Sequence, residues 1–533
     1  MRRRVDQGTR AGYAAAAIVV ILAVGSVVTG CTVGPQYSRE PAPVPVQYKQ
    51  MKGWKPARPN DDVDRGNWWT VYKDSGLNTL MPQVEVSNQT VAAAAAAYEQ
   101  ARALIREAQA GFFPTGTAEY GVTRTRTGPL ANSGTDIGAA ATTNRTTYTT
   151  VYSAPISGSW DLDVWGKVRR QVESNTAAAQ ASAADLDNAK LSAQAALATA
   201  YFNLRATDSL IELLRRTVAQ YKKTLDIVQN QYKAGYSVTS GDVATAQAQV
   251  LTAQAQLINA ELSRTQYENA IALLVGRPPD EVAVARRALN GTVPKVPVAL
   301  PSTLLERRPD IAAAERTMQQ ENALIGVAEA AWFPDISVTA MIQYLGPIPL
   351  PFSLPRSVAS VGANAAETFF NGGLTAAQVD AARATYWESV ANYRQTVLTA
   401  FQQVENELAA IHRYRAQLDV LQRAVVAQRS AVEVYLNQFQ AGLVAFTTVV
   451  TAEVQLLADS EAELTSRQNL FLASVALIEA LGGGWDTTLL PTQTQLQKDF
   501  SFLPQLESSP SPGSTIPNDV LVPPPIAPPP AAQ

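Results

Sequence analysis

The stretch that decides the fold is LTAAQVDAARATYWESVANYRQTVLTAFQQVENELAAIHRYRAQLDVLQRAVVAQRSAVEVYLNQFQA, residues 374–441, which runs for 68 residues without a glycine or a proline. Residues 167–234 form a second stretch of the same length and kind. The flanking glycines are Gly373 and Gly442 for the first and Gly166 and Gly235 for the second. A helix of this length spans about 100 Å, several times the width of a globular domain. The two stretches therefore predict an elongated helical protein.

Apolar residues recur every seven positions along both stretches. The later series is Val390, Val397, Val404, Ile411, Leu418, Val425, Val432 and Phe439. The earlier series is Leu197, Leu204, Ile211, Val218, Leu225 and Tyr232. A strict seven-residue repeat is typical of helices that supercoil left-handedly around their neighbours. We therefore expect these residues to face other helices.

The two series superpose at a constant offset of 207 residues, which indicates an internal duplication. One copy cannot bury its apolar seam alone, so the copies must pack on each other or on other subunits. Past Gly235 and Gly442 the chain runs back through residues 242–275 and 448–481, which are rich in alanine and glutamine. Small residues let helices approach closely, so the return segments predict a wall of helices.

The N-terminus carries a targeting signal. Three arginines at 2–4, an apolar run over 11–28 and the tetrapeptide Val28-Thr29-Gly30-Cys31 predict a signal peptide that ends in a lipobox. An uncleaved anchor helix is the alternative. Cys31 is the only cysteine, so we expect no disulfide and no thiolate metal site, and we expect Cys31 to carry a diacylglycerol. A net charge of −3 offers no basic field for nucleic acid.

Two segments alternate between apolar and polar residues, 147–162 and 336–344, and 115–127 and 357–366 are weaker partners. Each copy is thus predicted to supply a β-hairpin, with tips near 128–145 and 346–355. Strands of about ten residues with two such faces suit a membrane barrel. Four strands cannot close a barrel, so this interpretation requires a homo-oligomer. A soluble antiparallel sandwich is the alternative. Pro155 lies inside the best strand, and we expect a bulge there.

Aromatic residues crowd the four predicted junctions between helices and strands. They are Phe112 and Phe113, Trp160 and Trp165, Trp332 and Phe333, and Phe369 and Phe370. If both hairpins point the same way, these residues form a girdle at one bilayer interface. Ordinary core packing is the alternative.

Motifs for catalysis are missing from the sequence. His412 is the only histidine, and no nucleophile elbow, phosphate loop or metal-ligand spacing occurs, so we expect neither an enzyme nor a metal site. The turns near Gly235 and Gly442 lead into Asp242, Thr447 and Thr448. The simplest prediction is that Asp242 and one of the two threonines are N-caps. A carboxylate at such a turn could also lock neighbouring helices or filter cations.

We divide the first half of the chain into a signal peptide with lipobox (1–30), a lipidated N-terminal strap (31–62), helices of the first copy (63–114), a first β-hairpin (115–164) and a first long helical hairpin (165–276). A linker (277–301) leads to a helix of the second copy (302–334), a second β-hairpin (335–371) and a second long helical hairpin (372–482). The last part is a C-terminal segment with a proline-rich tail predicted to be disordered (483–533).

Several motifs resemble those of a known family. They are Cys31-Thr-Val-Gly-Pro-Gln-Tyr37, Trp68-Trp69 with Asp74 and Leu77, Leu304-Leu-Glu-Arg-Arg-Pro-Asp-Ile311, both Phe-Pro junctions, the glycines that precede the long helices and the duplicated Ala-Gly turns. Together they make nearly the whole chain resemble the outer-membrane efflux proteins, the TolC-like outer-membrane factors, and among them the NodT-type lipoproteins.

The resemblance implies a mainly α fold with membrane β-strands. In such a homotrimer the duplicated helical hairpins form a periplasmic barrel, and four strands per chain contribute to a shared 12-stranded barrel in the lipid of the outer membrane. It implies a passive duct that expels small molecules and docks on a periplasmic adaptor protein and an inner-membrane pump of the proton-driven RND class. No cofactor is implied beyond the lipid on Cys31.

The resemblance also points to a gate at the periplasmic tip. Asp242 matches an acidic gating residue of the family, and we hypothesise that it helps to hold the tip closed. Threonines stand at Thr448 and Thr451, where the family often has aspartate, so an acidic ring does not carry over. The gate candidates are Asp242, Thr448, Thr451, Gly235 and Gly442.

Three other functions remain as alternatives. A channel for type I-like secretion would share the fold and differ in its pump. A structural coiled-coil envelope lipoprotein would not need amphipathic hairpins, and an enzyme would need motifs that the sequence lacks.

Overall fold

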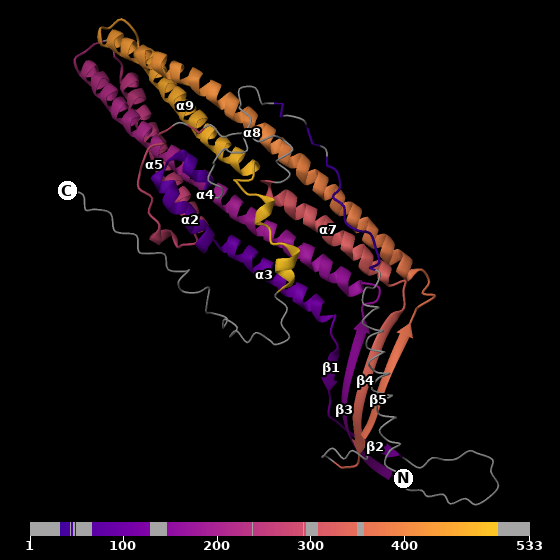
Figure 1. Ribbon diagram of the computed structural model, residues 1–533. Coiled ribbons are helices and arrows are strands. Elements are labelled where there is room, and N and C mark those ends of the chain that lie inside the picture. Colours follow the sequence, from indigo (N-terminus) through magenta and orange to yellow (C-terminus); the bar gives the residue numbers. More distant parts are fainter. Residues whose placement is uncertain are drawn as a thin grey trace, which may run out of the picture.

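The protein is an elongated bundle of helices with one antiparallel sheet at one end (Figure 1). The computed structural model describes residues 32–42, 44–45, 48–49, 67–127, 147–236, 238–291, 293–294, 307–348 and 357–498. The predicted signal peptide, Cys31, the first hairpin tip, most of the second tip and the proline-rich tail lie outside the described residues.

Two helices of 67 residues each run the length of the bundle, α4 (Lys167–Lys233) and α8 (Leu374–Gln440). Each begins directly after a glycine in the left-handed region, with φ of 82° at Gly166 and 91° at Gly373. A side chain at such a φ would be strained, so glycine is the natural residue for this sharp entry. The predicted long helices are confirmed to within one residue.

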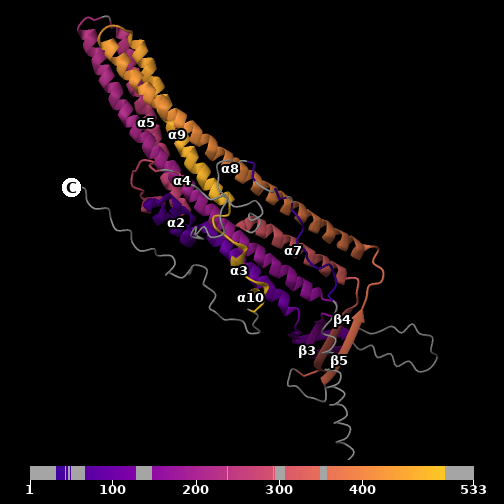
Figure 2. The same cartoon turned by 45° about the horizontal axis from the view of Figure 1, so that its top comes forward.

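Shorter helices repeat the duplication. Helices α3 (Gln89–Ala110) and α7 (Pro309–Ala330) each have 22 residues, and α5 (Ser240–Leu274) and α9 (Phe446–Ala480) each have 35. Helices α3 and α5 pack against α4, and α7 and α9 pack against α8, with α7 and α9 also touching α4 (Figure 2). No helix in the described ranges is both long and apolar enough to cross a membrane.

The residues of the seven-residue series are buried or partly buried, with one exception. Val390, Val397, Val404 and Ile411 of α8 are at most 1 % exposed, whereas Tyr232 of α4 is 49 % exposed. The prediction for Tyr232 was therefore wrong for the single chain. Burial near the end of α4 has shifted to residues such as Tyr221, Thr224 and Val228, as expected when 3.6 residues per turn drift from a period of seven.

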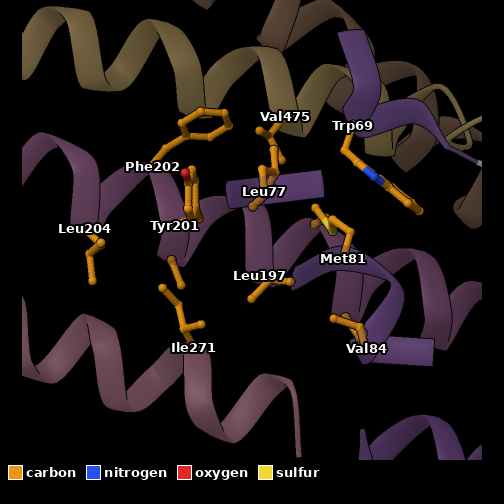
Figure 3. Packing of buried hydrophobic residues seen from close by; sticks show 14 of the residues in the cluster. Trp69, Leu77, Met81, Val84, Leu197, Tyr201, Phe202, Leu204, Ile271 and Val475 are labelled. Atoms are coloured by element: carbon orange, nitrogen blue, oxygen red, sulfur yellow. The ribbon is translucent and has the colours of Figure 1, made fainter. Parts of the chain in front are cut away.

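A cluster of buried side chains joins both copies at the middle of the bundle. Helix α2 (Ser75–Ser87) and the 3₁₀ turn η1 (Trp68–Tyr72) supply Trp69, Leu77, Met81 and Val84. They pack with Leu197, Tyr201, Phe202 and Leu204 of α4, Ile271 of α5 and Val475 of α9 (Figure 3). We call this cluster the waist. Among the described residues, three short elements remain, η2 (Pro279–Glu281), η4 (Thr487–Leu489) and α10 (Gln493–Gln497).

The sheet contains β1 (Thr115–Ala118), β2 (Gly121–Thr127), β3 (Thr147–Leu162), β4 (Asp335–Gly346) and β5 (Ser357–Ala366). β1 and β2 both pair with β3, which pairs with β4, which pairs with β5. There are thus five described strands instead of four, because the first predicted strand is interrupted after Ala118.

Pro155 explains the interruption. Ala118 pairs with Ile156 and Gly121 with Ser153, so the register continues across the break and no residue is inserted. The predicted bulge was wrong. The amide of Glu119 donates to the carbonyl of Pro155, but proline has no N–H to return the second ladder bond.

Candidate functional site: the sheet, the waist and the helix tip

The register gives the sheet one apolar and one polar face, because residues directly opposite each other share a face. Tyr152, Ala154, Ile156, Trp160 and Leu162 of β3 lie opposite Gly346, Tyr344, Ile342, Val338 and Ile336 of β4. The alternate residues of β3, Ser153, Ser157, Ser159 and Asp161, lie on the other face with Thr339 and Ser337. This face is mainly polar, although Met341 and Leu345 of β4 also lie on it. The alternation read from single segments thus extends across neighbouring strands.

The aromatic junction residues lie at the end of the sheet that meets the helices. The indole N–H of Trp160 donates to the carbonyl of Phe112 (2.9 Å), and that of Trp165 donates to the carbonyl of Pro334 (2.8 Å). The rings of Trp165 and Phe333 stack with centroids 4.8 Å apart. The structure thus joins the first, second and third junctions directly.

Six of the eight aromatic residues are exposed. They are Phe113, Trp160, Trp332, Phe333, Phe369 and Phe370, and the last two reach 95 % and 81 %. Phe112 and Trp165 are partly buried. Aromatic residues this exposed contribute little to a core, so the junctions present an apolar surface around the base of the sheet.

The strap that follows Cys31 is fixed to the helices beside this surface. The amide of Val33 donates to the carbonyl of Trp165 (3.1 Å), and the Arg170 guanidinium donates to the carbonyls of Val33 and Gly34 (2.9 and 3.0 Å). Further along, Asn322 of α7 donates to the carbonyl of Pro35 (3.0 Å). Arg394 of α8 contacts Glu40 (3.3 Å), so the described part of the strap takes its position from α4, α7 and α8.

The motif residue Asp74 organises one side of the waist. Its carboxylate accepts from the amides of Gly76 and Leu77 as the N-cap of α2, and from the Tyr201 hydroxyl of α4. Burial alone would raise the pKa of Asp74, but the hydrogen bonds from Tyr201, Leu77 and Gly76 lower it below its usual value. The Asp74 motif, one of those on which the resemblance rests, therefore joins α2 to α4.

The second motif joins the other copy. Arg308 is 8 % exposed, and its guanidinium donates to Asp310 and Gln403 and to the carbonyl of Ala480 (2.9 Å). It therefore links the start of α7 to α8 and to the end of α9. Leu304, with residues 305 and 306, lies outside the described residues.

A buried charge network, which the sequence reading missed, holds the linker at the waist. Asp208 accepts from Arg205 (3.3 Å), from Arg264 (2.8 Å) and from the amide of Arg287 (3.0 Å). Arg205 also donates to the carbonyl of Ala285, and Arg264 to that of Val284. The sequence shows the spacing of Arg205 and Asp208 at i, i+3 in α4 and of Arg264 and Glu268 at i, i+4 in α5. It does not show that the two pairs meet in the fold.

A second missed residue is Glu453 of α9, which is 3 % exposed. Its Oε1 accepts from the Thr224 hydroxyl of α4 (2.7 Å), while its Oε2 and the nearby Tyr221 hydroxyl have no partner among the described residues. Burial raises the pKa of Glu453 to about 7. No sequence signal marked it, because its burial depends on how α9 lies on α4.

The two turns between long and return helices meet at the tip far from the sheet (Figure 1). Phe439 and Phe446 of the second copy pack with Val228 and Ala246 of the first. Gly235 and Gly442 have φ of 77° and 73° and end the long helices. The gate candidates are therefore on adjoining turns.

Asp242 was predicted to be the N-cap of α5, and this prediction was wrong. Thr239 is the N-cap, its hydroxyl accepts from the Asp242 amide, and Asp242 accepts from the amide and hydroxyl of Thr239. The N-cap of α9 is Ala445, so Thr447 and Thr448 lie inside the first turn. The prediction for α5 was wrong because Thr239 and Asp242 form a capping box, in which the third helical residue bonds back to the cap. The prediction for α9 was wrong because that helix already begins at Phe446, before either threonine.

Two further observations concern chemistry. His412 is exposed on α8. Within the described ranges no group of three His, Cys, Asp or Glu side chains is placed to hold a metal ion.

Comparison with solved structures defines the class of protein. The chain matches the outer-membrane channel OprN with a TM-score of 0.76 and 27 % identity, over 85 % of this chain and 100 % of that one. It matches the open state of the MtrE outer membrane channel of Neisseria gonorrhoeae with a TM-score of 0.72 and 26 % identity, over 86 % and 99 %. The fold is that of TolC-like outer-membrane channels.

The family model for outer membrane efflux proteins matches residues 80–277 and 300–483, and the chain belongs to this family. It is 28 % identical over 461 residues to the toluene efflux pump outer membrane protein TtgC of Pseudomonas putida, covering 86 % of this chain and 93 % of that protein. It is 27 % identical over 467 residues to the cation efflux system protein CusC of Escherichia coli, covering 87 % and 97 %. The chain is an outer-membrane efflux channel of a Gram-negative bacterium, with its helices in the periplasm.

Proposed function

We propose that the chain assembles as a homotrimer that conducts small molecules passively from a periplasmic adaptor and an inner-membrane pump to the exterior. In this assembly each chain gives four lengths of strand, with β1 and β2 counted as one, to a shared 12-stranded barrel. The observation that supports this proposal is the described sheet, which has an apolar face, a mainly polar face and two open edges.

The open edges require partners if the apolar face meets lipid. β1 and β2 form one edge and β5 forms the other, and among the described strands neither edge has a further partner. Unpaired backbone groups cost several kcal/mol each in hydrocarbon, roughly the loss of a buried hydrogen bond without replacement. Joining the edges of three chains removes the cost, and the polar faces then line a water-filled lumen.

The proposed partners follow from the class. A duct without a nucleotide site needs an energised pump in the inner membrane, for which we propose the proton-driven RND class, and an adaptor that spans the gap. The relatives are named for toluene, cation and pyoverdine export. We therefore propose small molecules and ions as cargo, with a diacylglycerol on Cys31 as the anchor.

The remaining site assignments belong to the same proposal. The eight junction aromatics form the girdle at the periplasmic interface of the membrane, which fits the exposure of six of them. Asp242, Thr448, Thr451, Gly235 and Gly442 form the gate at the tip. The strap, the linker and the segment after residue 483 form the equatorial belt around the waist.

The test is the conductance of the purified, lipidated protein in planar bilayers, together with its migration as an unheated oligomer. We expect a heat-sensitive trimer and discrete conductance steps. A stable oligomer that gives no steps, even with substitutions at Asp242, would contradict a duct and favour a structural envelope protein.

A further inference from the structure

The charged residues of the sheet are sorted by face. The polar face carries Glu119, Asp161 and Asp335, because each aligns with the polar positions of β3 and β4. The apolar face of the described sheet carries only Arg124 and Arg126, opposite Thr150 and Tyr148. A face meant for lipid thus has two cations and no anion.

Both arginines lie at the end of the sheet remote from the helices. β2 occupies that end, and Arg126 is opposite Tyr148, twelve positions along β3 from Trp160 at the helical end (Figure 1). Twelve residues of strand tilted by ~40° rise about 30 Å, close to the thickness of the hydrocarbon core. An arginine costs about 2–4 kcal/mol at the centre of a bilayer but close to nothing at the interface. The pair therefore fits the interface opposite the junction aromatics.

The surroundings leave both guanidinium groups able to bind a ligand. Arg124 and Arg126 are exposed, and neither has an ion pair within the described ranges. The Arg124 guanidinium lies over the Tyr148 ring, 5.2 Å from its centroid. A cation–π contact uses no N–H donor of the guanidinium, whose forked N–H groups match the geometry of phosphate. Residues at i and i+2 of a strand point the same way, so the two forks face one side.

We propose that Arg124 and Arg126 bind the phosphate groups of a phosphorylated lipid headgroup in the outer leaflet. The inference rests on the proposed barrel, which places this end of the sheet at the exterior because the helices are periplasmic. A trimer carries three such sites. Exposed Tyr148, which lies opposite Arg126, is the aromatic partner expected at such an interface.

The experiment uses the intact oligomer in phosphatidylcholine vesicles that contain either bisphosphorylated lipid A or the same lipid with its phosphates removed. Lipid retained after a detergent wash is counted by native mass spectrometry. We expect the wild type to retain the phosphorylated form about tenfold more, the ratio that one or two charge-assisted hydrogen bonds give. Arg124→Gln with Arg126→Gln should remove the preference. Arg216→Gln with Arg423→Gln, at exposed arginines of α4 and α8, should keep it.

Three results would overturn the inference. One is equal retention of the two lipids by the wild type, and another is an unchanged preference in the Arg124 and Arg126 double variant. The third is complete displacement of the lipid by millimolar inorganic phosphate, which would indicate a general anion site. Conductance in bilayers of phosphatidylcholine alone distinguishes a failure of the proposed lipid site from a failure of the proposed barrel. Steps without a lipid preference overturn only this site, whereas no steps in any variant overturn the barrel and the site together.

Discussion

The Thr224 hydroxyl of α4 donates a 2.7 Å hydrogen bond to the carboxylate of Glu453 on α9, which joins the two copies in the half of the bundle near the tip. The carboxylate is buried and its second oxygen has no partner among the described residues. Burial disfavours the charged form and raises the pKa of Glu453 from 4.5 to about 7. The joint between the copies is therefore sensitive to pH near neutrality.

Glu453→Gln should remove part of the pH dependence of stability. The folded protein binds this proton more tightly than the unfolded chain, so the stabilisation is complete below pH 4.5 and is lost as the pH rises through about 7. The variant should equal the wild type near pH 4 and exceed it at pH 8 by up to about 3 kcal/mol, since each pKa unit represents about 1.4 kcal/mol. Thermal unfolding of the purified oligomer at the two pH values measures this.

Comparison with the wild type is necessary because burial also raises the pKa of Glu407, Glu461 and Glu479. Glu433→Gln, at an exposed site of α8, is the matched control and should leave the pH profile unchanged. Parallel profiles for Glu453→Gln and the wild type would show that Glu453 keeps an ordinary affinity for its proton.

Asp208→Asn should weaken the attachment of the linker at the waist. Asp208 is the common acceptor for Arg205 and Arg264, whose side chains are 6 % and 9 % exposed. Breaking a buried pair leaves an uncompensated charge and typically costs about 3–5 kcal/mol. We expect a lower unfolding temperature and faster tryptic cleavage after Arg277, since Arg205 and Arg264 hold the following segment by its carbonyls.

The matched control is Asp419→Asn, which breaks the i, i+4 pair with Arg423 on the surface of α8. Both side chains of that pair are 73 % exposed, and such pairs contribute at most about 0.5 kcal/mol. Equal effects of the Asp208 and Asp419 substitutions would refute a special role for burial.

Two substitutions separate the capping and gating roles at the tip. Asp242→Asn removes the charge but keeps an oxygen to accept from the Thr239 amide, whereas Thr239→Ala removes the cap but keeps the charge. If the carboxylate helps to close the tip, Asp242→Asn should raise single-channel conductance and sensitivity of cells to vancomycin. Thr239→Ala should only loosen the start of α5, by about 1 kcal/mol. Closed-state conductance that follows Thr239→Ala and ignores Asp242→Asn would reduce Asp242 to a capping residue.

The sequence predicted the helices well because their signals are local. Long runs without glycine or proline and a repeated period determine both the limits of α4 and α8 and the burial of residues such as Val397 and Val404. The capping box at Thr239 was equally local, but two acceptors compete there and the sequence does not rank them. The strand at Pro155 shows the same limit, since an interruption without an inserted residue and a bulge have the same sequence signal.

The buried polar contacts could not be predicted in the same way. Asp208 and Arg264 are 56 positions apart, and Thr224 and Glu453 are 229 apart, so each contact depends on how two helices are placed along each other. A charged residue on a helix is usually solvated. Only the packing of α4 with α5 and α9 turns these particular side chains inward.

Gly326→Ala should displace the strap from α7. A Cβ at Gly326 would lie 2.8 Å from the Val33 carbonyl oxygen and 2.9 Å from the Arg170 side chain, closer than van der Waals contact allows. Either the strap moves away, which breaks its bond from Arg170, or the helix shifts, at a cost of about 1–3 kcal/mol. Hydrogen exchange at the Val33 amide should accelerate, because its bond to the Trp165 carbonyl depends on the same placement.

Gly241→Ala is the control for Gly326→Ala, because we expect it to stabilise the protein and not to destabilise it. Gly241 lies in the first turn of α5, and a Cβ there would make only an ordinary 3.4 Å contact with the Thr239 hydroxyl oxygen. Alanine favours a helix over glycine by up to about 1 kcal/mol, so this variant should be slightly more stable than the wild type. If both alanines stabilise the protein and the Val33 amide exchanges no faster, the strap does not rest on Gly326. The position of the chain that follows Cys31 would then depend on its other contacts, such as those with Arg170 and Asn322.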